Sequence, residues 1–337
     1  MDKLLTIAIP TFNRAKRFDK SLNDLLFQIN KTENKKYISV FISNNGSTDT
    51  TADVIARYST IFSQNDIPFS SHTFENNKGF DANVFNCYKK SDSEYVWFLA
   101  DDDNIIDNSI DSIINDIQKY NPNVLNFNFD QPPYTLNNPL NTSTSLFINV
   151  DKDNIQSISK IIEWPKLATL VIRRNNGQSG EKVEHLYSSF MHVALAIQTA
   201  LDYGRVLHSE NFIARPDTDY MDHINFPPYI FNALVMTVEI VLRENNKYDL
   251  CKYLKLEKVD PLTSSLFTLE SFYMGKFVLT PELKAILYST VFDEMKRLKI
   301  NKISMSLFKR IVKLYISYLY NLGSIILTGK RATKLRH

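Results

Sequence analysis

Short apolar runs alternate with segments of helical spacing through the first 130 residues of this 337-residue chain. Five runs are predicted to be buried strands, because they are short and bounded by polar residues: 4–9, 37–43, 70–74, 95–100 and 124–129. Four segments between them are predicted to be helices: 15–28, 48–58, 81–91 and 105–120. Strands and helices in alternation predict βαβ units, and therefore an α/β fold with a mostly parallel sheet flanked by helices.

The pattern changes beyond residue 130. Residues 131–160 are rich in Pro, Asn, Ser and Thr, which is typical of a loop or lid. A strand at 163–174, a helix at 187–203 and an extended segment at 206–212 follow. Beyond residue 227 only helices are predicted, at 229–242, 263–273, 281–298 and 304–326. We therefore expect an α/β domain at residues 1–215 and a helical C-terminal region at residues 216–337.

Bulk composition narrows the class of protein. A net charge of +2 gives no basic field that would attract nucleic acid, so no nucleic-acid partner is expected. Cys87 and Cys251 are the only cysteines and lie far apart, which excludes a disulfide framework and suits a reducing compartment. The apolar run at 4–9 is too short for a signal peptide, and no run reaches the roughly 18 apolar residues that span a bilayer. These features predict a cytoplasmic protein.

Three consecutive aspartates, Asp101, Asp102 and Asp103, directly follow the apolar run at 95–100. Like charges this close repel one another, so the arrangement favours a bound cation. Carboxylate oxygens are the ligands that Mg²⁺ and Mn²⁺ prefer, and these ions commonly keep coordination positions for phosphate oxygens. The simpler alternative is a solvated acidic turn in which Asp102 or Asp103 caps the next helix.

Three further loops, the first at 9–14, the second at 44–51 and the third at 75–83, carry polar residues at the same predicted edge of the sheet. This edge lies beyond the carboxyl ends of the strands, where such sheets bind ligands. The second loop, NNGSTDTT at 44–51, also predicts a tight turn at Gly46 and a helix capped by Ser47 or Thr48. Taken singly, the first loop is equally well explained as a strand end, the second is better explained as an ordinary strand-to-helix turn, and the third is only a weak signal. The candidate binding residues in these loops are Pro10, Thr11, Asn13, Arg14, Asn44, Lys78, Gly79 and Asn83.

Together, in this order and at these spacings, the loops resemble the family 2 glycosyltransferases, which have the GT-A fold. The motifs that carry the resemblance are IPTFNR (9–14), NNGSTD (44–49), NKG (77–79) with Asn83, and YVWFLADDD (95–103). It extends over residues 1–215 and is strongest in the first 110. The resemblance implies transfer of a sugar from a nucleotide-sugar donor to an acceptor hydroxyl, with inversion at the anomeric carbon.

The resemblance also implies roles for the aspartates. Asp101 and Asp103 are the expected ligands of Mg²⁺ or Mn²⁺ on the donor diphosphate, with Asp102 facing the ribose or the sugar. Three aspartates in a row leave this register ambiguous by one residue. A dication there would neutralise the charge that gathers on the leaving diphosphate. The first loop and Asn44 are expected to hold the nucleoside, and Asp101 and Asp102 to contact the donor as well.

Two positions depart from the family pattern. Asn44 stands where the family usually has an aspartate facing the base, and an amide can donate and accept, so it suits uracil, thymine or cytosine. The Glu-Asp pair that usually supplies the general base is missing, and counting back about a dozen residues from Gly204 leads to His192. His192, Glu184 and Glu181 are therefore the candidate bases. A core histidine bonded within the protein is the simpler explanation of His192.

The C-terminus is basic, with no Asp or Glu after Glu294. Apolar residues recur there at helical spacing, so the segment can form a basic amphipathic helix on an anionic inner-leaflet surface. The alternative is a helix packed on the catalytic domain with a solvated basic face. Many bacterial family members build O-antigen or capsule units on a membrane lipid carrier. The resemblance thus implies a saccharide or undecaprenyl-linked acceptor and a peripheral position at the cytoplasmic face of the inner membrane.

The leading hypothesis is therefore a metal-dependent inverting hexosyl- or deoxyhexosyltransferase of surface polysaccharide assembly. A nucleotidyltransferase also combines a parallel sheet with metal-binding aspartates, but it needs a glycine-rich phosphate loop after the first strand, and IPTFNRAKR has no glycine. A catalytically impaired GT-A scaffold is consistent with the missing Glu-Asp pair. Hydrolysis of nucleotide sugars in the presence of Mn²⁺ distinguishes an enzyme from a scaffold.

Overall fold

The computed structural model describes residues 3–130, 146–148, 158, 161–162, 165–186, 190–216, 228–247 and 250. The chain divides into two compact units, one of residues 1–184 with 190–225 and one of residues 185–189 with 226–337. The expected boundary at residue 215 stays a prediction. The basic C-terminal segment, most of the loop at 131–160 and the helices predicted at 263–273, 281–298 and 304–326 lie outside the described residues.

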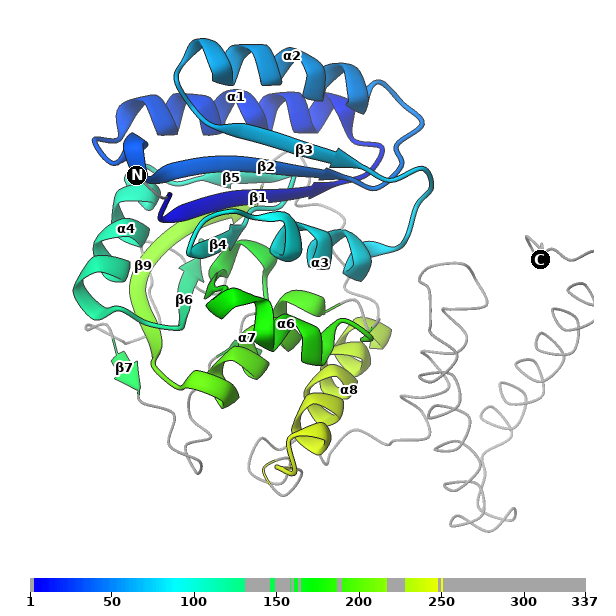
Figure 1. The fold of residues 1–337 in the computed structure, drawn as a ribbon, viewed down its shortest axis with the longest axis vertical. Coiled ribbons are helices and arrows are strands. Elements are labelled where there is room, and N and C mark those ends of the chain that lie inside the picture. Colours follow the sequence, from blue (N-terminus) through cyan, green and yellow to red (C-terminus); the bar gives the residue numbers. More distant parts are fainter. Residues whose placement is uncertain are drawn as a thin grey trace, which may run out of the picture. The chain divides into compact units, whose positions relative to one another are not determined.

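Among the described residues, the first unit is built on a nine-stranded sheet with the order β3-β2-β1-β4-β8-β6-β9-β5, and β7 pairs with β9 (Figure 1). The strands are Leu5–Thr11 (β1), Ile38–Asn44 (β2), Phe69–Thr73 (β3), Tyr95–Phe98 (β4), Asp103–Ile105 (β5), Val124–Phe129 (β6), Leu146–Ile148 (β7), Leu170–Arg173 (β8) and Val206–Pro216 (β9). Strands β1 to β4 are parallel, and β8 is antiparallel to both β4 and β6. The predicted α/β class is confirmed.

Helices cover both faces of the sheet. In the first unit these helices are Ala15–Lys31 (α1), Thr51–Gln64 (α2), Phe80–Lys90 (α3), Ser109–Tyr120 (α4), Gln178–Val183 (α6) and Met191–Tyr203 (α7). Helix α8, Pro228–Glu244, belongs to the second unit. The apolar stripes of α1, α2 and α4 share one buried cluster with the strands. Figure 1 shows α1 and α2 on one side of β1 to β3 and α3 on the other. No described helix is long and apolar enough to cross a membrane.

The two central strands explain why the first loop starts where it does. Every residue of β1 and β2 is buried, as expected for parallel strands covered on both faces. Pro10 is tolerated inside β1 because β4 pairs with β1 only as far as Ala8, so at Pro10 only the β2 ladder continues. The carboxyl ends of β1, β2 and β4 therefore reach the same edge of the sheet, and the polar loops leave from it.

The predicted start of helix α2 is wrong. Helix α2 begins at Thr51 rather than after Ser47 or Thr48, and the side chain of the N-cap residue, Thr50, makes no capping hydrogen bond. The Asp49 carboxylate instead accepts hydrogen bonds from the N–H groups of Thr51 and Ala15, at 3.0 and 3.1 Å, and so joins this turn to the start of α1.

The helix predicted at 105–120 begins only at Ser109, because residues 103–105 form β5 and pair with the end of β9. This pairing excludes the alternative in which Asp102 or Asp103 caps a helix. The strand predicted at 163–174 is likewise shorter. It is confined to β8 and follows a 3₁₀ turn, Leu167–Thr169.

Candidate active site

Hydrogen bonds join the loops at the carboxyl edge of the parallel strands. The Thr11 hydroxyl donates to Asp101 Oδ2 at 2.7 Å, which links the ends of β1 and β4. The Thr11 carbonyl accepts from Asn45 N–H at 3.0 Å and from Asn83 Nδ2 at 3.3 Å, which brings in the loop after β2 and the start of α3. The four motifs that lie far apart in the sequence are thus brought together at one edge.

Asp101 is buried and held by the first loop. Thr11 Oγ1 and the Phe12 N–H donate to its carboxylate, and Arg14 Nε lies 3.8 Å from Oδ1. Burial raises the pKa of Asp101 to about 6, although the Arg14 charge and the hydrogen bonds act in the opposite direction. One carboxylate oxygen is therefore engaged by the protein, and the other faces the guanidinium.

Arg14 connects two of the three aspartates, since it also forms an ion pair with Asp102 through Nη1. Its side chain is 37% exposed, so water screens part of this attraction. Arg14 therefore places a positive charge next to both carboxylates at this edge.

The surroundings of the Asp103 carboxylate differ from those of Asp101. No hydrogen bond from the described residues holds its carboxylate. Burial, followed by repulsion from Asp102, raises the pKa of Asp103 to about 8, and the positive charge of Lys166 acts against this rise. Lys166 lies just before β8 and was not among the predicted site residues. A single lysine in the sequence EWPKL carries no motif that could have identified it.

These carboxylates fit a metal site that a bound ligand completes, rather than one formed by the protein alone. No three His, Cys, Asp or Glu side chains of the described segments are arranged to hold a metal by themselves. The raised pKa values of Asp101 and Asp103 nevertheless come from desolvation and mutual repulsion, which a dication would relieve. The residues present therefore fit Mg²⁺ or Mn²⁺ only if a ligand supplies further oxygen atoms.

Asn13 and Asn44 shape the second loop from its two ends. Asn13 has φ +52°, and its side-chain oxygen accepts from the Thr48 N–H at 2.7 Å. Asn44 is fully buried, and its side-chain oxygen accepts from the Ser47 N–H at 3.1 Å. Asn44 Nδ2 is a buried donor without a partner in the described structure. Both amides thus build the loop, and Asn44 retains one unused donor.

Asn45 joins the second loop to the third and was also not predicted. Its Nδ2 donates to Asn77 Oδ1 at 2.9 Å and to the Gly79 carbonyl at 3.0 Å, and its Oδ1 accepts from the Lys78 N–H at 2.8 Å. Two consecutive asparagines at a strand end were the available signal.

Gly79 adopts φ +91° directly before α3, and the Lys78 side chain is exposed. The Asn83 side-chain oxygen is buried and unpaired in the described structure.

Gly46 packs against the third loop, and we expect its replacement by alanine to be costly. Gly46 has φ +69°, and a Cβ there would lie 2.7 Å from the backbone carbon of Asn76. Gly177 has φ +84° but open space around a Cβ, so it is a matched control. Gly46→Ala should lower the free energy of unfolding by about 2 kcal/mol more than Gly177→Ala, measured by urea denaturation. Equal losses would show that the third loop yields to the methyl group.

His192 is buried at the start of α7. Its Nε2 donates to the Pro165 carbonyl at 3.0 Å, and the rings of Phe80 and Phe190 lie at centroid distances of 6.1 and 5.8 Å. Burial lowers the pKa of His192 to about 4, so the ring is neutral at neutral pH. Its role as general base stays a prediction, and both its burial and its lowered pKa weigh against it. The geometry instead suits a ring that fixes the segment containing Pro165.

Glu184 and Glu181 lie beside other parts of the first unit. Glu184 forms an ion pair with Lys89 at 3.3 Å. Helix α3 starts at the site edge with Phe80, and Lys89 is nine residues further, about 14 Å along the helix axis. Glu181 borders a surface hollow with Tyr203 and its neighbours. Among the described contacts, none connects either glutamate to the three aspartates.

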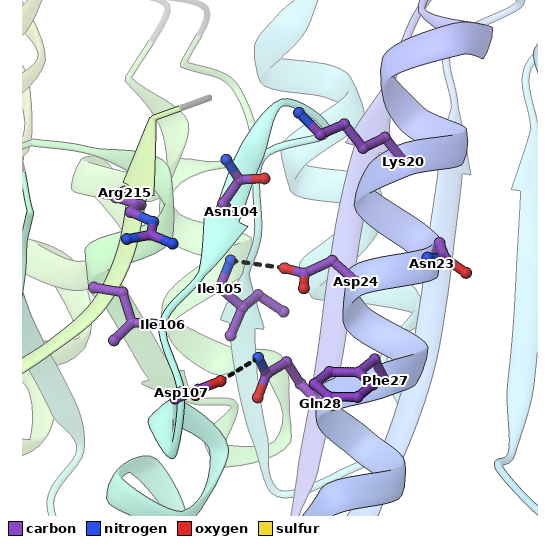
Figure 2. Close-up of a pocket in the computed structure, with 10 residues that line it drawn as sticks. All are labelled: Lys20, Asn23, Asp24, Phe27, Gln28, Asn104, Ile105, Ile106, Asp107 and Arg215. Atoms are coloured by element: carbon purple, nitrogen blue, oxygen red, sulfur yellow. Dashed lines mark hydrogen bonds between the residues drawn. The ribbon is translucent and has the colours of Figure 1, made fainter. Parts of the chain in front are cut away.

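A separate groove of about 670 Å³ lies between α1, β5 and the end of β9 (Figure 2). Its polar groups already bond across it, because Asp24 accepts from the Ile105 N–H at 3.2 Å and Gln28 donates to Asp107 at 2.8 Å (Figure 2). None of the predicted site residues lines this groove. It is therefore distinct from the edge that carries the aspartates.

The fold and this edge agree with a known family. The family model described as Glycosyl transferase family 2 matches residues 6–177, just over half of the chain. The chain therefore belongs to glycosyl transferase family 2, and it is a glycosyltransferase. A comparison with curated protein sequences finds no match.

Solved structures share its GT-A fold. The structure of S. aureus TarS 1-349 is 14% identical with a TM-score of 0.55, over 97% of this chain and 92% of that chain. The same fragment in complex with UDP-GlcNAc is 15% identical, with a TM-score of 0.53. The mannosyltransferase PcManGT from Pyrobaculum calidifontis, in complex with GDP-Man and Mn²⁺, is 12% identical with a TM-score of 0.53, over 95% and 88% of the two chains. In the longer TarS structure the match covers 43% of that chain.

Proposed function

We propose that this glycosyltransferase uses a nucleotide-sugar donor with Mg²⁺ or Mn²⁺ and transfers the sugar, with inversion, to a saccharide or undecaprenyl-linked acceptor of surface polysaccharide, such as O-antigen or capsule. The observation that carries the proposal is the cluster of mutually repelling carboxylates at the carboxyl edge of β4, next to the Arg14 guanidinium. Structures of the same fold hold UDP-GlcNAc in one case and GDP-Man with Mn²⁺ in another, which supports a nucleotide-sugar donor here.

The residues at this edge have different proposed roles in binding the donor. Asp101 and Asp103 are the proposed metal ligands, and Thr11 keeps Asp101 in position through its hydroxyl. A bound dication would neutralise charge on the leaving diphosphate. Arg14 lies close enough to Asp101 and Asp102 to add a second positive charge. The remaining proposed donor contacts are Pro10, Asn13, Asn44, Lys78, Gly79, Asn83 and Asp102.

The candidate bases belong to the acceptor side of the proposed reaction. An inverting transfer needs a base within hydrogen-bond reach of the acceptor hydroxyl. Of the candidates, His192 lies beside the segment that reaches the aspartates, whereas Glu184 and Glu181 lie beside other elements. We further propose a cytoplasmic enzyme whose basic C-terminus contacts the inner leaflet, on the basis of its charge pattern.

Slow donor hydrolysis tests the proposal without knowledge of the acceptor. The full-length protein is incubated with Mn²⁺ and with UDP-, dTDP-, GDP- and CDP-sugars in turn, and release of the nucleoside diphosphate is measured. We expect one nucleotide class to be hydrolysed, EDTA to abolish release, and added Mn²⁺ to restore it. Neither binding nor hydrolysis of any donor would contradict the proposal and favour the catalytically impaired scaffold.

A further inference from the structure

Two exposed aromatic side chains belong to the loops at the carboxyl edge of the parallel strands. In the described part of the chain four large hydrophobic side chains are exposed, and two of them, Phe12 and Phe80, lie in these loops. A single exposed ring on a surface needs no explanation, but small-molecule sites are commonly lined by aromatic rings. Phe80, the first residue of α3, is 43% exposed.

The backbone that carries Phe80 is fixed on both sides. The carbonyl of Gly79, directly before it, accepts a hydrogen bond from Asn45 Nδ2 at 3.0 Å. One turn later, Asn83 Nδ2 donates to the Thr11 carbonyl at 3.3 Å. Phe80 therefore has a defined position relative to the first and second loops.

The ring of Phe80 is also supported by α7. The His192 ring meets it at a centroid distance of 6.1 Å and an interplanar angle of 85°, which is an edge-to-face contact. His192 is itself buried and bonded to the Pro165 carbonyl. The neighbouring Asp81 accepts from the Met191 N–H at 2.9 Å, which joins the starts of α3 and α7. The Phe80 ring is therefore held in place while much of its surface stays accessible.

Phe80 lies on the other side of the sheet from the helix that follows the proposed nucleoside contacts. Asn13 bonds to the backbone of the second loop, which leads into α2, whereas Phe80 starts α3 and contacts α7. Figure 1 shows α2 and α3 on opposite sides of β1 to β3. Asp101, proposed to hold the diphosphate, bonds to Thr11 at the end of β1. Since the sugar follows the diphosphate in a donor, the sugar is the part that extends toward Phe80.

The chemistry of a sugar ring suits such a surface. One face of a pyranose ring commonly presents C–H groups, whose hydrogens carry a partial positive charge. The face of an aromatic ring is negative, so stacking orients the sugar and also buries apolar surface. A free nucleoside diphosphate, which has no transferred sugar, gains nothing from this contact.

We propose that Phe80 is the platform on which the transferred sugar of the donor stacks, and that His192 is a positioning residue that supports its ring. The inference rests on the proposed nucleotide-sugar donor and adds the residue that distinguishes the nucleotide sugar from the free nucleotide. It also gives His192 a role that needs no proton transfer.

Calorimetry of the full-length protein with Mn²⁺ tests the platform. The probes are UDP-GlcNAc, GDP-Man, dTDP-glucose and CDP-glucose, each paired with its free nucleoside diphosphate, and the variants are compared on the pair that the wild type binds. We expect Phe80→Ala to bind the nucleotide sugar about tenfold more weakly and the free nucleoside diphosphate unchanged. Phe80→Tyr should keep both affinities, whereas Phe80→Leu, which is apolar but has no ring, should bind the nucleotide sugar more weakly.

His192→Gln tests the positioning role, because glutamine can still donate to the Pro165 carbonyl but removes the ring beside Phe80. It should weaken only the nucleotide sugar, and it should add no further loss to Phe80→Ala. Wild-type affinity for the nucleotide sugar in His192→Gln would overturn this role. Circular dichroism checks the fold of each variant.

Phe27→Ala is the matched control, since Phe27 is also an exposed phenylalanine but lines the separate groove along α1. It should change neither affinity. If Phe80→Ala weakens the nucleotide sugar and the free nucleotide equally, or changes neither, the platform is overturned and the proposed donor stands. If the wild type binds none of the four nucleotide sugars, the proposed donor fails, and the platform fails with it.

Discussion

Asp103→Asn is expected to lower sugar transfer by roughly 10²–10³-fold, because the amide removes the carboxylate proposed to hold the metal on the leaving diphosphate. The same change should raise the stability of the metal-free protein. Burial raises the pKa of Asp103 to about 8. Near pH 7 this carboxyl group is therefore mostly protonated in the folded state and ionised in the unfolded state, so folding must take up a proton. Asparagine avoids this, and we expect a gain of about 1–3 kcal/mol in the free energy of unfolding.

Transfer rates and urea denaturation at pH 7 measure both effects. The gain in stability should shrink as the pH falls toward the unfolded pKa of an aspartate, near 4. Asp107→Asn is the control, because Asp107 is an exposed carboxylate whose pKa is lowered by hydrogen bonds from Gln28 and Lys31. It should keep full activity and gain no stability. An Asp103→Asn enzyme with wild-type transfer would remove Asp103 from the metal site.

His192 is expected to make the protein less stable as the pH falls from 6.5 to 4. Its folded pKa of about 4 lies below the unfolded value near 6.5, so within this window only the unfolded state takes up the proton. The contribution is fully present above pH 6.5 and is lost progressively toward pH 4, by up to about 3 kcal/mol. Asp101 and Asp103 titrate in the opposite sense, since burial raises their pKa values.

A comparison with His192→Gln isolates this contribution. Glutamine can still donate to the Pro165 carbonyl but does not titrate. The stability of the wild type relative to His192→Gln should therefore fall by about 3 kcal/mol between pH 7 and pH 4.5 in urea denaturation. Parallel pH profiles for the two proteins would show that His192 has the same pKa in the folded and unfolded states. That result would return His192 to consideration as the general base for the acceptor.

The elements that could be predicted from the sequence carry their own local signal. Strands β1, β2 and β4 are apolar runs that end in polar loops, and their parallel order follows from the helices between them. Strand β5 could not be predicted, because Ile105 fits the spacing of the following helix and its pairing partner in β9 lies more than a hundred residues later.

The site residues also divide into those that a local sequence signal predicts and those that only the fold brings to the site. The aspartates and loop asparagines were found because several unusual residues occur together. Lys166 could not be found, since only the antiparallel β8 brings it to the edge. Residue type alone also did not show that Asn13 and Asn44 bond to the backbone of the second loop.

Strand β9 has a consequence for how this protein can be divided. It is the common neighbour of β5, β6 and β7, and it places Asp103 opposite Pro216. The family match ends at residue 177, before α7 and β9. A fragment cut at that point would expose one hydrogen-bonding edge of β6 and leave β5 without its neighbour. The segment that matches the family model is therefore too short to hold Asp103 in place, because it lacks the strand that pairs with β5.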